Sequence, residues 1–171
     1  SARRQRQMCI RDSNYINMFN LEKQDLKNKK VIIRVDLNVP LDDNLKVTDT
    51  TRIEACKETI DLILDKGGTC ILISHFGRPK EREDKFSLKH IVKTVSEVLD
   101  HPVVFHNDCI GNEVQEVISN LNQGDIILLE NLRFYKEETL GDSLFAEELS
   151  KLGDIYVNDA FGTCHREHSS T

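Results

Sequence analysis

The stretch KVIIRVDLNVP, residues 30–40, decides the fold of this chain. It contains the continuous apolar run Val31 to Ile33, which is typical of a strand buried on both faces of a sheet. Polar side chains and a proline follow at once, so the strand ends there. Later in the chain come four similar apolar runs, namely Cys70 to Ile73, Val103 to Phe105, Ile126 to Leu129 and Ile155 to Val157. We therefore predict five strands.

The segments between these runs carry apolar residues at helical spacing. A stripe from Ile53 to Leu64 predicts an amphipathic helix over about residues 52–66, with Thr51 and Glu54 as a capping box and Gly67-Gly68 as its stop. Three further stripes predict helices from Leu88 to Leu99 behind Ser87 as N-cap, from Val114 to Leu121, and from Leu144 to Leu152. The alternation predicts an α/β fold, a three-layer Rossmann-like domain with an open, mainly parallel sheet flanked by helices.

Composition excludes several classes of protein. The 171 residues suit a single domain, and a net charge of -6 lacks the clustered cationic field that nucleic-acid binding needs. No apolar run approaches the roughly 20 residues that span a bilayer, so we expect no membrane partner. The five cysteines show no CxxC spacing, which argues against a disulfide framework or a structural zinc site. We therefore expect a cytoplasmic protein.

The first residues differ in charge from the rest. Residues 1–13 contain four Arg and one Asp, a net +3, while the remainder of the chain carries -9. The segment lacks a continuous amphipathic face, and its string resembles a translated sequencing adapter, with a transit peptide as the alternative. We interpret residues 1–17 as a non-native leader and residues 18–171 as one domain.

Polar residues follow four of the predicted strands, and arginine and histidine are frequent among them. In an open α/β sheet, ligands bind beyond the carboxyl ends of the strands, so these residues are expected to lie at one edge. They are Arg34, Asp36 and Asn38 after the first strand; Ser74, His75 and Arg78 after the second; Glu130, Asn131 and Arg133 after the fourth; and Asn158, Asp159, His165, Arg166 and His168 after the fifth.

Cations gathered at one edge of an acidic chain favour a small, multiply charged anion as ligand. Arginine suits bidentate recognition of carboxylate and phosphate. Arg52 stands at the start of a predicted helix, where a cation gains nothing from the helix dipole. We therefore expect it to bind a ligand anion, with an ordinary solvated arginine as the alternative. The structural alternative is that the arginines pair with Asp36, Glu130 and Asp159, and that Arg34, inside its strand, buttresses its neighbours.

Motifs of other chemistries are absent or weak. The chain has no GxxxxGK[ST] and no GxGxxG after a strand, and no Ser or Cys in the context of a nucleophile elbow. His165 and His168 lack a nearby third ligand, so anion binding is favoured over a metal pair. We predict no metal site.

The motifs RVDLNVP, SHFGRP, LLENLRF and GDIYVNDAFGTCHREHSST resemble the N-terminal domain of phosphoglycerate kinase, from about Lys30 to Thr171. The resemblance implies reversible phosphoryl transfer between 1,3-bisphosphoglycerate and ADP, giving 3-phosphoglycerate and ATP in glycolysis. It further implies a monomer whose N-terminal domain holds the glycerate ligand. The nucleotide-binding domain, which carries ATP or ADP with Mg²⁺, is expected to be absent, so this chain is expected to bind no cofactor and to be inactive alone.

The resemblance also implies roles for single residues. Asp36 and Asn38 would hydrogen-bond the glycerate hydroxyl and carboxylate region, and Arg52 would stabilise the transferring phosphoryl group as the catalytic residue. The basic patch around carboxylate and phosphate would comprise Arg52, His75, Arg78, Arg133 and Arg166, supported by Arg34, His165 and His168.

Two alternatives remain at this stage. Asp36-Leu37-Asn38 is distantly similar to the nucleophilic aspartate motif of haloacid-dehalogenase-like phosphatases, although the position of the general acid is taken by Asn38, which has no titratable proton. The other alternative is a non-catalytic anion-binding module that uses the same basic edge.

Overall fold

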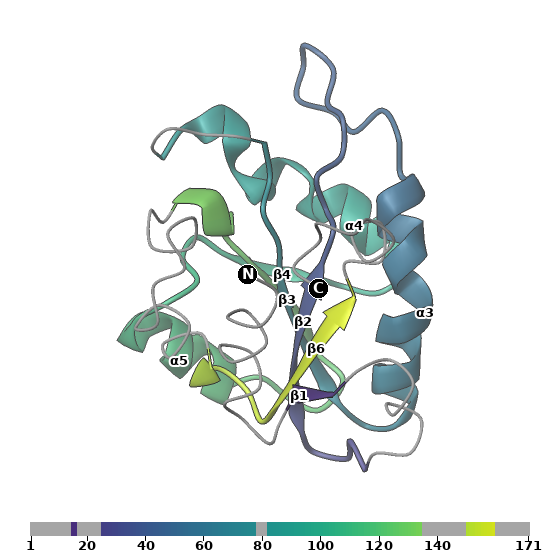
Figure 1. The fold of residues 1–171 in the computed structure, drawn as a ribbon, viewed down its shortest axis with the longest axis vertical. Helices are drawn as coiled ribbons and strands as arrows, with labels where there is room; N and C mark the ends of the chain where they lie inside the picture. Colours follow the sequence, from purple (N-terminus) through teal and green to yellow (C-terminus); the bar gives the residue numbers. More distant parts are fainter. Residues whose placement is uncertain (1–14, 17–24, 78–81, 135–149, 160–171) are drawn as a thin grey trace, which may run out of the picture.

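A parallel sheet forms the centre of the computed structural model, which describes residues 15–16, 25–77, 82–134 and 150–159. Its strand order is β1-β6-β2-β3-β5-β4, and every pair of neighbouring strands is parallel. Figure 1 shows the sheet between its helices. The strands are β1 (Tyr15–Ile16), β2 (Lys30–Val35), β3 (Thr69–Ile73), β4 (Val104–His106), β5 (Ile126–Leu129) and β6 (Ile155–Asp159).

All five predicted strands are present, and the described residues contain a sixth strand that we did not predict. The additional strand β1 has only two residues, and Tyr15 and Ile16 pair with Tyr156 and Val157 of β6. Two residues are too few to form an apolar run, so the hydrophobic pattern does not reveal this strand. It falls within residues 1–17, whose origin as a non-native leader stays a prediction.

The helices of the described residues differ in detail from the prediction. They are α3 (Thr51–Asp65), α4 (Val92–Leu99) and α5 (Asn112–Ser119), with three 3-10 turns, η1 (Asp84–Phe86), η2 (Leu88–His90) and η3 (Leu132–Phe134). Helix α3 ends before Gly67-Gly68, as predicted. The fourth predicted helix falls largely on residues 135–149, outside the described part of the chain.

The predicted capping box at the start of α3 is wrong. Thr51 is the first helical residue and Thr50 is the N-cap, with no side-chain hydrogen bond from the cap. Asp49 takes over this role, because its Oδ1 accepts hydrogen bonds from the backbone N–H of Thr51 at 2.9 Å and from the Thr51 hydroxyl at 2.6 Å. The carboxylate therefore satisfies a donor at the helix start.

The predicted helix from Leu88 to Leu99 is divided into η2 and α4. Ser87 does cap the first part, since its Oγ accepts a hydrogen bond from the Lys89 N–H at 3.2 Å. Ile91 separates the two parts and serves as the N-cap residue of α4. The N-cap prediction for Ser87 is confirmed, whereas a continuous helix behind it is wrong.

Two apolar layers, one on each face of the sheet, make the domain three-layered. One layer joins Ile33 and Leu72 to Ile60 of α3 and Val95 of α4. The other joins strand residues such as Ile71 to helix α5. Figure 1 shows α3 and α4 on one side of the sheet and α5 on the other. The predicted three-layer α/β architecture is confirmed.

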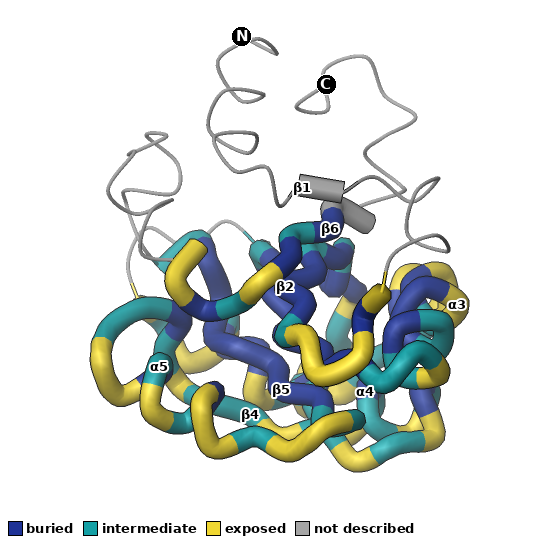
Figure 2. The backbone as a smooth tube through the Cα atoms, turned by 90° about the horizontal axis from the view of Figure 1, so that it is seen from below, coloured by how far each residue is buried: buried dark blue, intermediate teal, exposed yellow. Residues whose placement is uncertain are grey.

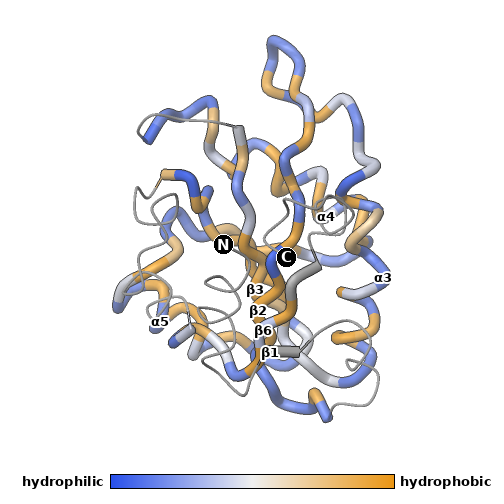
Figure 3. Tube along the Cα trace, viewed as in Figure 1, coloured by the Kyte–Doolittle hydropathy of each residue, from blue (hydrophilic) through white to orange (hydrophobic). Residues whose placement is uncertain are grey.

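The central strands β2, β3 and β5 are the most deeply buried strands for which the structure describes every side chain. Figure 2 shows β2 and β5 as buried tube, and Figure 3 shows β2 and β3 as largely hydrophobic. Burying one such aliphatic side chain contributes about 1.5–3 kcal/mol to folding. In the described residues, no helix combines the length and apolar character that crossing a bilayer requires.

Candidate anion-binding site

The carboxyl ends of the central strands bring three described loops to one edge of the sheet. Strand β2 lies between β3 and β6, and Arg34 stands opposite Ile73 on one side and Asn158 on the other. Strand β5 lies beyond β3. The loops that leave β2, β3 and β5 are therefore neighbours, and a hydrogen bond joins Phe76 and Asn131 of the last two across 55 residues of sequence.

Arg52 and the loop after β2 form a direct cluster. Nη1 of Arg52 donates hydrogen bonds to Oδ1 of Asp36 at 3.3 Å and to the backbone oxygen of Asn38 at 2.6 Å. The side chain of Arg52 is 46% exposed and that of Asp36 is 11% exposed. Within the described residues, Nε and Nη2 of Arg52 have no protein partner. The guanidinium thus has two nitrogens that no described protein group occupies.

Asn38 joins this cluster to the loop after β3. Its Oδ1 accepts a hydrogen bond from the backbone N–H of Gly77 at 2.9 Å, which turns its Nδ2 amide away from that loop. In the part of the chain that the structure describes, Nδ2 makes no hydrogen bond. The backbone N–H of Asn38 donates to Oδ1 of Asp36 at 3.1 Å, so Asp36 and Asn38 hold each other in place.

Gly77 has a conformation that suits glycine. Its φ is +62°, and a Cβ placed there would lie 2.4 Å from the Phe86 ring. A side chain would therefore push Phe86 aside or move the backbone N–H that holds Asn38. Glycine at this position allows the loop after β3 to approach the loop after β2 closely.

Ser74 links all three loops from the interior. It is fully buried, and its Oγ accepts a hydrogen bond from the backbone N–H of Leu37 at 3.0 Å. Its backbone oxygen accepts another from the Leu132 N–H, also at 3.0 Å. Ser74 therefore fixes the start of the loop after β2 through its side chain and the start of the loop after β5 through its backbone oxygen.

Glu130 and Asn131 have positions that the sequence pattern does not reveal. We expected Glu130 as a possible partner of an arginine, but its carboxylate accepts hydrogen bonds from the Ser87 hydroxyl at 2.6 Å and from the backbone N–H groups of Leu88 and Asn131 at 2.9 and 2.8 Å. Asn131 is fully buried, and its side chain is hydrogen-bonded to Phe76, to Phe86 and, within its own loop, to Arg133. Their place directly after β5, in the motif ENLRF, was the only indication in the sequence.

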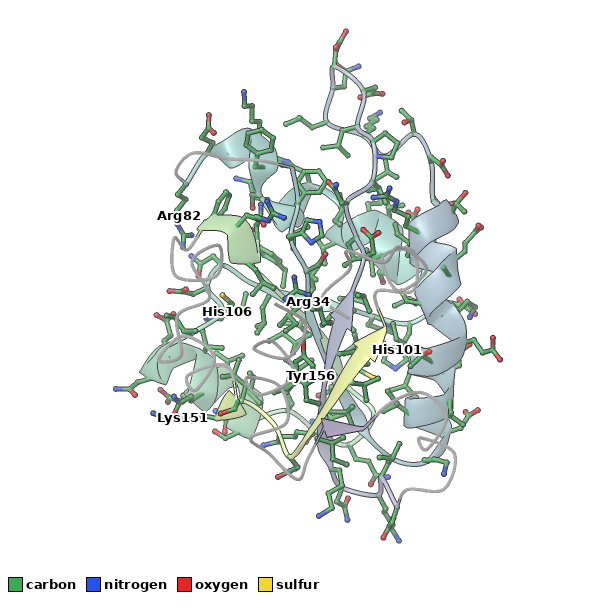
Figure 4. The ribbon with its side chains drawn as sticks, viewed as in Figure 1. Arg34, Arg82, His101, His106, Lys151 and Tyr156 are labelled. Carbon is green, nitrogen blue, oxygen red and sulfur yellow. The ribbon has the colours of Figure 1, made fainter. Side chains whose placement is uncertain are left out.

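Six of the predicted site residues are described. Asp36, Asn38 and Arg52 are in direct contact, while His75 and Arg133 are partly buried on the two adjoining loops. Arg34 is partly buried within β2 and is labelled in Figure 4. The remaining predicted residues, Arg78, His165, Arg166 and His168, lie outside the described residues, as do the side chains of Asn158 and Asp159.

Arg82 lies near this edge but was not predicted as a site residue. Its guanidinium carbon is 5.2 Å from the centre of the Phe134 ring, and its Nη1 donates a hydrogen bond to the backbone oxygen of Asn107 at 3.1 Å. Figure 4 shows it beside η3. These contacts give Arg82 a structural role at the rim.

The carboxylate nearest to the start of α3 is held in its charged form. Hydrogen bonds from the side chain and the backbone of Thr51 lower the pKa of Asp49, and the nearby Arg52 charge lowers it further. The approach to Arg52 therefore includes a negative charge on Asp49 and another on Asp36.

Fold and site together define a class of protein. A parallel α/β sheet carries at its carboxyl edge an exposed arginine, an amide and a carboxylate, which makes this a Rossmann-like domain with polar side chains at the edge where open α/β sheets bind ligands.

Comparison with known proteins supports a more specific assignment. The family model described as phosphoglycerate kinase matches residues 21–171. The phosphoglycerate kinase of Dictyoglomus turgidum is 52% identical over 154 residues, which are 90% of this chain and 39% of that protein. The cytosolic phosphoglycerate kinase of Triticum aestivum is 55% identical over 88% of this chain and 38% of its own length. This chain belongs to the phosphoglycerate kinase family.

Solved structures agree with this assignment. Phosphoglycerate kinase from Pyrococcus horikoshii superimposes with a TM-score of 0.76 at 35% identity, over 88% of this chain and 38% of that one. The enzyme from Coxiella burnetii gives a TM-score of 0.74 at 35% identity, over 91% and 38%. The chain thus spans about 38% of the length of the relatives it matches. The family assignment replaces the haloacid-dehalogenase-like alternative.

Proposed function

We propose that this chain is the 3-phosphoglycerate-binding part of a phosphoglycerate kinase, which transfers a phosphoryl group reversibly between 1,3-bisphosphoglycerate and ADP to give 3-phosphoglycerate and ATP. The observation that carries the proposal is the cluster of Arg52, Asp36 and Asn38 at the carboxyl edge of the sheet. Family membership supports the choice of this anion over others. The chain alone is expected to bind the glycerate ligand without turning it over.

The available polar atoms suit the parts of a phosphorylated three-carbon acid. Nε and Nη2 of Arg52 would face a phosphoryl or carboxylate group, and one such charged hydrogen bond is worth about 1.5–3 kcal/mol. Nδ2 of Asn38 is a donor for a carboxylate or hydroxyl oxygen, because Oδ1 is already held by Gly77. Oδ2 of Asp36 is an acceptor for the glycerate hydroxyl.

We assign the rest of the basic patch to the adjoining loops. His75 and Arg133 come from the loops after β3 and β5, and Arg78 and Arg166 would complete the patch, with Arg34, His165 and His168 in support. Residues from four strand ends would then share the charge of one ligand. An acidic chain with a basic edge of this kind concentrates an anion where the loops converge.

The proposed reaction requires positioning and charge neutralisation rather than a covalent nucleophile. Phosphoryl transfer places negative charge on the oxygens of the moving group, and preorganised donors stabilise that charge. Arg52 is the described residue best placed for this role, since it is half exposed while Asp36 and Asn38 hold its Nη1. We therefore propose Arg52 as the catalytic residue of this chain.

The residues of this edge do not fit a magnesium ion. Among the described residues, no three His, Cys, Asp or Glu side chains lie close enough together to hold a metal. Arginine next to Asp36 also opposes a dication at that carboxylate. We therefore propose that Mg²⁺ and ATP or ADP are held by a nucleotide-binding domain outside this chain.

Titration of the chain with 3-phosphoglycerate tests the binding proposal. A ligand that binds only the native state raises the melting temperature, by the equivalent of about 2.7 kcal/mol at a concentration of one hundred times Kd. Asn38→Ala, which removes the Nδ2 donor and the Oδ1 partner of the Gly77 N–H, should remove most of the shift. Lys57→Ala, which removes a cation of α3 from an exposed pair with Asp61, should leave it intact. No shift at millimolar ligand and low salt would contradict the proposal.

We further propose a cytoplasmic, monomeric protein. The wheat relative and an Arabidopsis thaliana relative with 53% identity are cytosolic forms, whereas two Arabidopsis relatives with 52% identity are chloroplastic. Cell fractionation with organelle markers distinguishes the two locations, and gel filtration with light scattering measures the oligomeric state.

A further inference from the structure

We propose that Asn131 is a positioning residue, which fixes the loop of His75 to Gly77 and the loop of Arg133 in the mutual arrangement that a glycerate ligand requires. The inference rests on the proposed function, since it concerns the same site. It differs in assigning a role to a buried, uncharged residue that need not touch the ligand.

The side chain of Asn131 is fully buried and fully hydrogen-bonded. Its Oδ1 accepts from the backbone N–H of Phe76 at 2.9 Å and from that of Arg133 at 3.0 Å. Its Nδ2 donates to the backbone oxygens of Phe76 at 2.7 Å and Phe86 at 2.9 Å. A primary amide offers two donors and two acceptor positions, and Asn131 uses all four.

These hydrogen bonds connect Asn131 to both halves of the ligand edge. Phe76 is held at its N–H and its carbonyl, and the next residue, Gly77, donates its N–H to Asn38. On the other side, the backbone of Arg133 is held directly. A displacement of the Asn131 amide would therefore move Phe76 and Gly77, and through Gly77 it would move Asn38. It would move the backbone of Arg133 directly, through one hydrogen bond.

Glu130 and Phe86 secure the same junction from behind. Glu130 Oε1 accepts from the backbone N–H of Asn131 and that of Leu88, and its Oε2 accepts from the Ser87 hydroxyl. The Phe86 ring lies against Gly77, where only a hydrogen atom fits. The segment 86–88 is thus locked to Asn131, and it closes the far side of the Gly77 loop.

The chemistry of the site selects an uncharged amide. Aspartate has nearly the same shape, but it would turn an acceptor toward the two carbonyl oxygens that Nδ2 now satisfies. A residue without polar atoms would leave the buried N–H and carbonyl of Phe76 and the partly buried groups of Phe86 and Arg133 without these partners. Asn131→Asp is therefore the sharpest test, because it preserves the Oδ1 contacts and removes the Nδ2 donors.

The readout is the dissociation constant of 3-phosphoglycerate for the chain, measured by isothermal titration at a temperature where each variant is folded by circular dichroism. We expect Asn131→Asp to weaken binding at least about tenfold, comparable to the loss of one charge-assisted hydrogen bond. The control is Ile118→Ala, which shortens a buried side chain on α5 beside Lys30 and Asp154. It should lower the melting temperature while leaving the dissociation constant within about twofold, since Lys30 and Asp154 lie at the starts of the strands, at the end of the sheet opposite to the proposed ligand site.

Double-mutant cycles separate a positioning role from a purely structural one. If Asn131 acts through Arg133 and the Gly77 loop, its substitution costs less affinity in Arg133→Ala or Asn38→Ala than in the unchanged chain. Multiplicative losses in both cycles, or unchanged affinity with a lowered melting temperature, would overturn the inference. If Asn131→Asp does not fold, Asn131→Ser, which retains one hydroxyl, is measured in the same way and must show the same coupling.

The same measurements distinguish a wrong ligand assignment from a wrong role for Asn131. If the unchanged chain does not bind 3-phosphoglycerate, the assignment of the ligand is wrong and no cycle is interpreted. If the unchanged chain binds and Asn131→Asp binds equally well, the ligand assignment stands and the positioning role of Asn131 is refuted.

Discussion

Arg52 is held by weak contacts that contribute more to orientation than to stability. Its ion pair with Asp36 joins an arginine that is 46% exposed to a carboxylate at 3.3 Å. Exposed pairs of this kind contribute about 0–1 kcal/mol to the free energy of unfolding, because water competes for both charges. The hydrogen bond to the Asn38 carbonyl fixes where Nη1 lies and leaves the outer face of the guanidinium open.

Gly77 offers a test of the close approach between the loops after β2 and β3. Gly77→Ala should lower the free energy of unfolding by more than Gly124→Ala, as measured by urea denaturation. Both glycines have positive φ, at +62° and +87°, so each substitution incurs about 1–2 kcal/mol of backbone strain. Only at Gly77 must the added methyl group also displace the Phe86 ring, for about 1–3 kcal/mol more.

Gly124 is the appropriate control because nothing lies within 4 Å of a Cβ placed there. Equal losses of stability for the two substitutions would mean that Phe86 moves away without cost. The close contact would then not be what requires glycine at position 77.

The sequence indicated which polar residues lie at the edge but not how they are bonded. Asp36, Asn38 and Arg52 were predictable because two of them follow a strand and the third opens a helix without benefit from its dipole. Asn131 was not assigned to the site, since its partners Phe76 and Phe86 are 55 and 45 residues away along the chain. Hydrogen bonds to distant backbone groups leave no pattern in side-chain types.

At the scale of elements, the start of α3 was predicted to within one residue, with the wrong cap. The pattern of Thr51 and Glu54 fits a capping box, but Asp49 lies outside that pattern and satisfies the Thr51 N–H instead. A charged oxygen next to a helix start is favoured over a hydroxyl, because it also interacts with the dipole.

Asp49 should make the start of α3 sensitive to acid. Its pKa in the folded chain lies below the usual 3.8, because hydrogen bonds from Thr51 favour the carboxylate. Its stabilisation is therefore fully present above the unfolded-state pKa, and it is lost as pH falls through the lower folded pKa. Urea denaturation should show wild type more stable than Asp49→Asn above pH 4, with the difference vanishing in stronger acid.

Asp84 is the control for that comparison, since its pKa is also lowered, mainly by the hydrogen bond from Lys89. Asp84→Asn should cause a separate loss of stability that also disappears in acid. It should not change the loss of stability caused by Asp49→Asn. A constant difference between wild type and Asp49→Asn at all pH values would show that the charge of Asp49 is irrelevant to the helix start.

The interrupted helix before β4 also has a local cause. The Asp84 carboxylate forms an ion pair with Lys89 and lies 3.3 Å from the His90 Nε2, and the Asp84 carbonyl lies 2.8 Å from the same nitrogen. These contacts are satisfied by two successive 3-10 turns rather than by one long helix. The apolar stripe is shared by both geometries, so periodicity alone does not distinguish them.

Ser87→Ala should destabilise the chain by about 2–3 kcal/mol in urea denaturation. The substitution removes the cap of η2, worth about 1 kcal/mol, and leaves an oxygen of the buried Glu130 without its hydroxyl donor. Ser119→Ala is the matched control, because its exposed hydroxyl bonds only to the Glu116 carbonyl within α5. It should change stability by less than about 0.5 kcal/mol. Similar losses for both would exclude a special role of the Ser87–Glu130 contact.

At the scale of the whole molecule, alternation of apolar runs and stripes was sufficient to predict a three-layer parallel α/β domain. Strand order was not predictable in the same way. β6, the last described strand, is inserted between β1 and β2, which are the first two. Burial on both faces makes all central strands look alike in sequence, so hydrophobicity does not specify which neighbours they choose.

A chimera would test the proposed phosphoryl-transfer reaction. This chain matches the Dictyoglomus turgidum relative over 154 residues, which are 39% of that protein, so the matching segment can replace its counterpart there. We expect the chimera to have phosphoglycerate kinase activity. Arg52→Ala in that chimera should lower kcat about 10²–10³-fold and leave KM for 3-phosphoglycerate within about threefold, because the lost stabilisation is confined to the transition state.

Lys57→Ala in the same chimera is the control and should leave both constants unchanged. A rise in KM alone after Arg52→Ala would assign Arg52 to ground-state binding. A chimera that folds and binds 3-phosphoglycerate but has no kinase activity would favour a non-catalytic anion-binding module.

The pairing of β2 with β6 has a consequence for the folding of this protein during its synthesis on the ribosome. Lys30 and Asp154 are hydrogen-bonded at the start of these two strands, although 124 residues separate them. While the chain is being synthesised, β2 can pair with β3 early, but its other side stays open until β6 has emerged. During that interval an apolar strand edge is available to other nascent chains. We therefore expect chains whose synthesis stops before β6 to aggregate. We also expect a pause in translation just after β5 to make the nascent chain more dependent on chaperones.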